Sequence, residues 1–171
     1  RFVPYRLSVL ANRVSRALAL HYRDRFGLSI PEWRVLAVLG RDNRLSAGEI
    51  AARTSMDKVK VSRAIAALLR KGLIRRQRDP LDRRITRIET TALGSEVYAA
   101  IAQLALAWQA RWLAGLAEEE LLTLFRLLDR LEARIQQLEG MREVSSFAEA
   151  QKEQTATAGL GHFMVDGGEV G

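Results

Sequence analysis

The residues whose chemistry is most evident are the lysines and arginines of one segment. Between Asp57 and Thr90 the chain has eleven Lys or Arg and four Asp or Glu, a net charge of +7. The other residues hold sixteen basic and sixteen acidic side chains, which cancel. A concentrated cationic patch attracts a polyanion, because each neutralised phosphate releases condensed counterions. Nucleic acid is therefore the first partner that the sequence predicts.

Catalytic chemistry leaves no comparable pattern. The two histidines, His21 and His162, lie far apart, and the chain has no cysteine, so we expect no metal site and no thiol nucleophile. The sequence contains neither a Gly-rich phosphate loop nor a nucleophile–base pair. We expect no catalytic residue, no metal and no cofactor. Because no long apolar run and no signal-peptide layout is present, we expect a cytoplasmic protein with no membrane partner.

The spacing of apolar residues predicts a mainly helical chain with one small hairpin. The expected helices span 5–26, 30–39, 47–53, 58–71, 91–113 and 118–139. Two capping boxes, Ser29 with Glu32 and Ser46 with Glu49, mark two helix starts, and Asp57 is a further N-cap. Two short strands, 73–78 and 84–89, flank a turn at 79–82. Residues 140–171 are predicted to form a loosely held polar tail.

A short helix, a tight turn, a second helix and a basic hairpin together predict a winged helix-turn-helix. The fold class is mainly α with a small two- or three-stranded β wing and a helical dimerisation region. The second helix would enter the DNA major groove with Lys58, Val59, Lys60, Ser62 and Arg63. At Val59 an apolar contact with a thymine methyl group is one interpretation. The alternative for this whole face is an ordinary solvated, charged helix surface.

The hairpin supplies a second group of cations. On or beside its two strands lie Arg75, Arg76, Arg78, Arg83, Arg84 and Arg87. Some of them protect an edge strand from aggregation. An arginine at the tip can instead reach a narrow minor groove, where the potential is most negative, with Asp82 holding its guanidinium.

The last predicted helix has the most regular apolar pattern. Its heptad seam consists of Leu121, Leu124, Leu128, Leu131, Ile135 and Leu138. The pattern fits packing within the chain and packing against a second copy equally well. Both can coexist on opposite flanks of the helix.

Three linked motifs resemble the MarR family of transcriptional regulators. Residues 79–84, followed by Ile88 and Thr91, look like the wing signature of that family. The pattern from Asp57 to Leu73 resembles its recognition helix, and residues 31–36 are similar to its second helix. The resemblance covers residues 5 to 139.

Membership of this family would imply an obligate homodimer on double-stranded DNA. Its interface would include Leu7, Leu10, Leu124, Leu128, Leu131 and Ile135. By position, Arg84 matches the family's wing arginine that enters the minor groove. Asp82 matches the residue that orients this arginine, and Arg83 would be a second contact. Leu81 stands where the family commonly has Arg, so that one wing contact is either absent or supplied by Arg78. The implied regions are a dimerisation helix (1–30), a DNA-binding domain (31–90), dimerisation helices (91–139) and the tail (140–171).

The resemblance also implies a repressor released by a small aromatic acid. The first helix resembles regulators of hydroxycinnamate catabolism, which respond to the free acid or to its coenzyme A thioester. The candidate effector residues are Arg13, Arg16, His21 and Trp33, with Arg6 as a further cation for thioester phosphates. For Trp33 the competing interpretation is a core residue, for His21 an interface histidine, and for the pair Trp108 and Trp112 simple packing. A DNA-binding activator or architectural protein without an effector is the alternative function.

Overall fold

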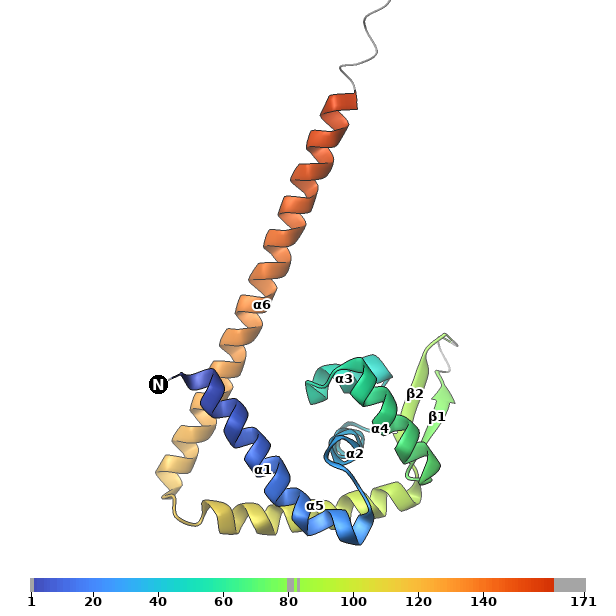
Figure 1. Ribbon diagram of the computed structural model, residues 1–171, viewed down its shortest axis with the longest axis vertical. Helices are drawn as coiled ribbons and strands as arrows, with labels where there is room; N and C mark the ends of the chain where they lie inside the picture. Colours follow the sequence, from blue (N-terminus) through green and yellow to red (C-terminus); the bar gives the residue numbers. More distant parts are fainter. Residues whose placement is uncertain (1, 80–81, 83, 162–171) are drawn as a thin grey trace, which may run out of the picture. The chain divides into compact units, whose positions relative to one another are not determined.

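The computed structural model describes residues 2–79, 82 and 84–161, with 141–161 by their backbone alone (Figure 1). The helices are α1 (Val3–Phe26), α2 (Ile30–Asp42), α3 (Ala47–Thr54), α4 (Lys58–Arg70), α5 (Ala92–Leu113) and α6 (Glu118–Gly161). The strands β1 (Ile74–Arg78) and β2 (Thr86–Thr90) pair antiparallel. The predicted fold class, mainly helical with a small β wing, is confirmed. The chain forms two compact units, Arg1–Ala114 and Gly115–Gly171.

Side-chain caps fix where the helices around the turn begin. In both predicted capping boxes the two hydrogen bonds are present: Glu32 and Ser29 exchange bonds of 2.7 and 3.4 Å, and Glu49 and Ser46 bonds of 2.7 and 3.2 Å. Asp57 accepts a hydrogen bond of 2.8 Å from the Lys60 amide at the start of α4. These contacts satisfy amides that a helix start otherwise leaves unpaired.

The hydrophobic core lies in the first unit, where α2, α3 and α4 pack together against the hairpin and α5. Its fully or almost fully buried side chains include Leu36, Leu39, Ile50, Leu68, Ile88 and Ile101. Ile88 also exchanges backbone hydrogen bonds of 3.0 and 2.8 Å with Leu45, which precedes α3. At Gly94 a β-carbon would overlap the carbonyl group of Leu73, so only glycine allows α5 to start this close to the hairpin.

Several predicted boundaries shift: α2 continues to Asp42 rather than ending at Leu39, and two other shifts have local reasons. α1 begins at Val3 rather than Tyr5, because Pro4 in the first turn lacks only an N–H that a helix start does not use. β2 begins at Thr86 rather than Arg84. The Asp82 carbonyl accepts from the Ile85 amide at 3.0 Å and its carboxylate from the Arg84 amide at 2.9 Å. Arg84 therefore lies in the loop rather than in the strand.

The prediction that the last helix ends at Glu139 is wrong, because α6 continues to Gly161. Gly140 costs a helix only about 1 kcal/mol relative to alanine, and the residues after it are mostly good helix formers without proline. The last part of the predicted tail, 162–171, lies outside the described residues. Within the described part of the chain, no helix combines the length and apolar character needed to cross a bilayer.

An ion pair joins the end of α4 to the start of α2. Glu32, only 7% exposed, accepts two hydrogen bonds of 2.9 Å from the Lys71 ammonium, which also donates to the Gly27 carbonyl at 2.6 Å. Burial by itself raises the pKa of Glu32. The hydrogen bonds from Ser29 and Lys71 outweigh that effect, and the pKa lies below its ordinary value of 4.5.

Replacing Glu32 with Gln should lower the free energy of unfolding by about 2–3 kcal/mol at neutral pH, because Lys71 loses its charged acceptor. The folded-state pKa of Glu32 is depressed, so this stabilisation is present above pH 4.5 and is lost as the pH falls through the folded pKa. Urea unfolding of both proteins across the acid range measures the difference. Glu49→Gln, at the same position of a capping box and with Arg87 as its ion-pair partner, is the comparison and should change stability less than Glu32→Gln does, because the Glu49 side chain is exposed. A Glu32→Gln effect that stays constant down to about pH 2 would contradict the assignment.

Candidate nucleic-acid interface

Helix α4 has two faces with different roles. Val61, Ile65 and Leu68 are buried in the core, which leaves the opposite face of the helix in solvent. That face exposes all five residues predicted to contact DNA: Lys58, Val59, Lys60, Ser62 and Arg63. They occupy the first two turns of the helix, the part of a recognition helix that contacts base edges.

The charges at the start of α4 are set by Asp57. Its carboxylate accepts from the Lys60 amide and forms a 2.9 Å ion pair with the Lys60 ammonium, contacts that lower the pKa of Asp57. Lys60 is therefore held beside the cap. Among the described residues, neither Lys58 nor Arg63 has an ion-pair partner.

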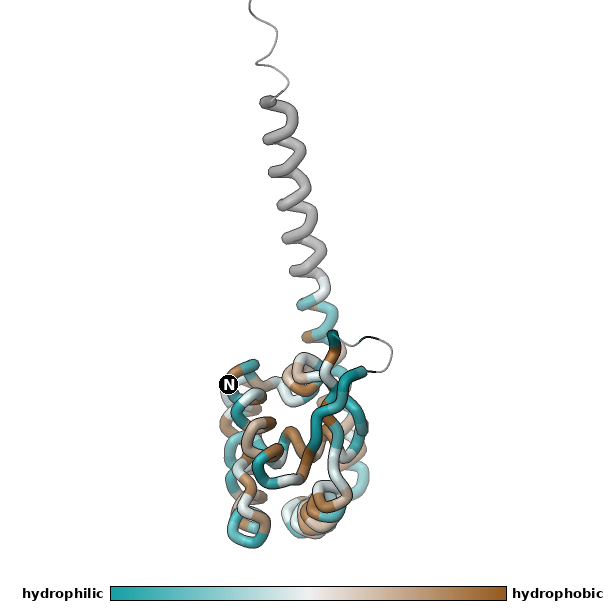
Figure 2. The backbone as a smooth tube through the Cα atoms, turned by 90° about the vertical axis from the view of Figure 1, so that its right-hand side faces the viewer, coloured by the Kyte–Doolittle hydropathy of each residue, from teal (hydrophilic) through white to brown (hydrophobic). Residues whose placement is uncertain are grey.

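A groove separates α4 from the hairpin and from the start of α3. Its lining includes Lys58 and Ser62 of α4, Arg76 of β1 and Thr86 of β2. Gly48, in the first turn of α3, adds a position without a side chain. In Figure 2 the hairpin is teal, and so hydrophilic, where its strands meet the loop drawn in grey. The groove thus has cationic and hydroxyl groups on both walls.

Two hairpin arginines brace the wing instead of remaining free. Arg87 donates to Asp79 at 2.8 Å and to Glu49 of α3 at 2.6 Å. Arg75 donates to Glu89 at 2.7 Å, its neighbour across the two strands. The pKa of Arg87 is raised, mainly by the hydrogen bond to Asp79. The negative charges of Glu49 and Asp79 raise it further. Through its contact with Glu49, Arg87 ties the hairpin to α3.

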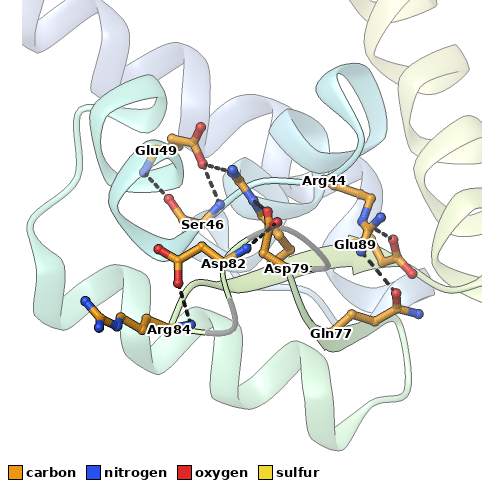
Figure 3. A network of polar contacts seen from close by, with 9 residues as sticks. Arg44, Ser46, Glu49, Gln77, Asp79, Asp82, Arg84 and Glu89 are labelled. Atoms are coloured by element: carbon orange, nitrogen blue, oxygen red, sulfur yellow. Dashed lines mark hydrogen bonds and ion pairs between the residues drawn. The ribbon is translucent and has the colours of Figure 1, made fainter.

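A third arginine, which the sequence analysis did not select, completes this bracing. Arg44 precedes α3, forms a 3.0 Å ion pair with Glu89 and donates to Gln77 at 3.1 Å (Figure 3). Sequence spacing alone could not reveal the contact to Gln77, because the two residues are 33 positions apart. The pair Arg75–Glu89 was missed as well, because the expected turn at 79–82 is shorter than the observed connection between Arg78 and Thr86, and the register of the strands differs accordingly.

At the wing tip the structure modifies the predicted role of Asp82. The contact that it shows between Asp82 and Arg84 runs from the Arg84 backbone amide, while the guanidinium extends away from the carboxylate (Figure 3). Asp82 therefore shapes the loop that carries Arg84. Arg78 and Arg84 are exposed, and no ion pair of either is found among the described residues. Arg83 and Leu81 lie outside the described residues.

The four residues predicted to bind an effector are not brought together. Arg13 lies in a hollow along the start of α1, Arg16 lines a cleft shared with Arg34 and Lys60, and His21 is exposed. Trp33 is half-buried, with its ring 5.7 Å from that of Tyr22 and 6.1 Å from that of Tyr98 between centroids. Each of the four is at a different place on the first unit.

Trp33 does line a cleft that the sequence analysis did not anticipate. All three tryptophans of the chain contribute to it, from α2 and α5, together with Tyr98 and Arg41. Trp108 and Trp112 are stacked at 5.3 Å between ring centroids. The cleft is mostly apolar, and Arg41, paired with Asp42 at 3.0 Å, is its one cation among the described residues. Trp33 and Trp108 line one cleft only because α2 packs against α5, so no local sequence signal links them.

Both units expose large apolar side chains at the predicted dimer positions. In α1 these are Leu7 and Leu10, which are 42% and 50% exposed. In α6 the exposed positions are Leu124, Leu128, Leu131 and Ile135. Such a density of exposed leucines along a helix is typical of a surface that another helix covers.

A helix-turn-helix with a cationic second helix and a braced basic hairpin defines a winged helix-turn-helix DNA-binding protein. A family model described as the MarR family matches residues 26–85. The HTH-type transcriptional regulator BilQ of Clostridium symbiosum is 30% identical over 105 residues, which make up 61% of this chain and 73% of that protein. The chain belongs to the MarR family of transcriptional regulators.

Solved structures agree with this assignment. A MarR/EmrR family transcriptional regulator from Acinetobacter sp. ADP1 is 28% identical with a TM-score of 0.72, and the match covers 78% of this chain and 94% of that one. A transcriptional regulator from Listeria monocytogenes complexed with a 26mer DNA has the same fold. Its TM-score is 0.72 at 18% identity, over 79% of this chain and 89% of the other.

Arg87→Ala should lower the urea midpoint of unfolding more than Arg75→Ala does, because two charge-assisted hydrogen bonds are lost, one within the hairpin to Asp79 and one to Glu49 of α3. Arg75→Ala removes one exposed ion pair from the same hairpin and should cost at most about 1 kcal/mol. Urea unfolding followed by circular dichroism measures both. Equal losses in the two variants would show that Arg87 has no special bracing role.

Proposed function

We propose that two copies of this chain bind a pseudo-palindromic operator on double-stranded DNA and repress transcription. A small aromatic acid, or its coenzyme A thioester, would then release the repressor. The observation that carries the proposal is the set of exposed cations on α4 and the hairpin that have no ion-pair partner among the described residues, of which Lys58 and Arg76 line the groove between these elements. Residues 31–90 would form the DNA-binding domain, and 1–30 with 91–139 the dimerisation region.

The DNA contacts divide between two grooves. The first turns of α4 would enter the major groove, where Arg63 can donate to a guanine edge and Lys58 to a phosphate. Arg84 at the wing tip would reach the adjacent minor groove, and Arg78 and Arg83 would supply further contacts. Because Arg87 ties the hairpin to α3, the two contacts would form as one surface.

The dimer follows from the apolar residues that a single chain leaves exposed. The seam of α6 repeats every three and four residues, as in helices that pack along their length. Leu7 and Leu10 would add α1 to the same interface. A twofold dimer presents two copies of α4, and this symmetry matches a pseudo-palindromic operator.

For the effector, the tryptophan cleft, which includes Trp33, suits an aromatic acid better than the surroundings of Arg13, Arg16 and His21, which do not line it. Its rings offer stacking surfaces, and Arg41 offers a cation for a carboxylate. The Tyr98 ring of the cleft lies directly against α2, because it occupies the space that a β-carbon at Gly40 would fill. The ring of an effector in the cleft would therefore press on α2, and α2 packs against α4. Release requires the effector to prefer an arrangement of α4 that DNA does not fit.

An activator or architectural protein without an effector remains the alternative function. Its DNA-binding surface would be the same, so the interface alone does not separate the two. The aromatic cleft with a cation at its edge favours an effector.

Arg84→Ala should weaken binding to a labelled duplex from the DNA upstream of this gene. The slope of log affinity against log salt should become shallower by about one unit, the effect of losing one cation at the phosphates. Fluorescence anisotropy at several salt concentrations measures both. Arg111→Ala, which removes an exposed arginine of α5, is the charge-matched control. A slope that changes equally in both variants would exclude Arg84 from the interface.

A hydroxycinnamate or its coenzyme A thioester should release the duplex and quench tryptophan fluorescence, because all three tryptophans line the cleft. Arg41→Ala should raise the effector concentration needed for release on the order of tenfold, because the effector's carboxylate loses its cationic partner. Arg16→Ala should leave that concentration unchanged. Tight DNA binding that neither compound disturbs would support the alternative function.

A further inference from the structure

Val59 is an unusual residue for its place in the fold. Its side chain is 59% exposed, in the first turn of α4. Within residues 21–79, 82 and 84 no other large apolar side chain is exposed. Helix stability does not explain a valine at position 59, because a β-branched residue in an exposed helix position is less favourable than lysine or alanine. The core contacts of α4 come from the opposite face, through Val61 and Ile65.

The neighbours of Val59 on the helix are groups that can read bases. Residues three and four positions later share its face, which places Val59 beside Ser62 and Arg63. Arg63 is exposed and has no ion-pair partner among the described residues, so its donors are available. Lys60, in contrast, is occupied by Asp57 at 2.9 Å. Val59 is therefore an apolar group within a polar, hydrogen-bonding face.

Resting on the proposed function, we infer that Val59 is a specificity-determining residue that packs against the 5-methyl group of a thymine. That methyl is the apolar group that a base pair presents in the major groove. Four residues of helix rise correspond to about 6 Å, or roughly two base-pair steps. The thymine therefore lies within about two base pairs of the base that Arg63 contacts, once in each half-site.

The test replaces thymines one at a time by deoxyuridine, which removes the methyl group and leaves base pairing intact. The duplex is first selected from a random library by the full-length wild-type protein. At one thymine in each half-site, the substitution should weaken wild-type binding about threefold to tenfold, the range for burying one methyl group. Val59→Ala should bind the thymine and the deoxyuridine duplexes with equal affinity at that position.

Ile85→Ala is the matched control, because Ile85 is an exposed apolar residue of the hairpin, 37% exposed. This variant should keep the full sensitivity to deoxyuridine, and circular dichroism verifies that both variants fold. If Val59→Ala keeps the sensitivity, or no thymine shows any, the inference is overturned while DNA binding stands. If the wild type selects no sequence at all, the proposed function fails and the inference with it.

Discussion

The attachment of the hairpin to the helices decides what this surface can do. Ile88 enters the core and shares two backbone hydrogen bonds with Leu45, immediately before α3. Arg87 and Arg44 add ion pairs on either side of this bridge. The hairpin is thus fixed to the same elements that orient α4. Without that attachment the wing would be an isolated two-stranded ribbon, which is only marginally stable in water.

The positive charge of the segment from Asp57 to Thr90 serves two purposes. Arg75 and Arg87 form ion pairs with Glu89 and Glu49, and these pairs stabilise the hairpin and its attachment to α3. Arg63 and Arg84 remain exposed, with no ion pair in the part of the chain that the structure describes, and they are left for a polyanion. Net charge therefore indicates that an anionic partner exists, whereas the ion pairs decide which cations face it. This division also explains why an arginine count alone overstates the number of DNA contacts.

Local features of this fold could be predicted from the sequence, and long-range ones could not. The capping boxes at Ser29 and Ser46 involve residues three positions apart, so their spacing alone reveals them. The pair Glu32–Lys71 spans 39 positions and arises only when α2 and α4 pack. The tryptophan cleft was missed for the same reason, because its rings come from α2 and α5. The end of α6 was misplaced because the prediction gave Gly140 too much weight as a helix terminator.

The proposed DNA binding requires α4 and the wing to contact DNA together, in two symmetric copies. Dimethyl sulfate tests this directly, because it methylates guanine N7 in the major groove and adenine N3 in the minor groove. On the selected duplex we expect protection of guanines in two half-sites about one helical turn or a multiple apart, each flanked by protected adenines. Protection confined to a single half-site, or to one of the two grooves, would contradict the account.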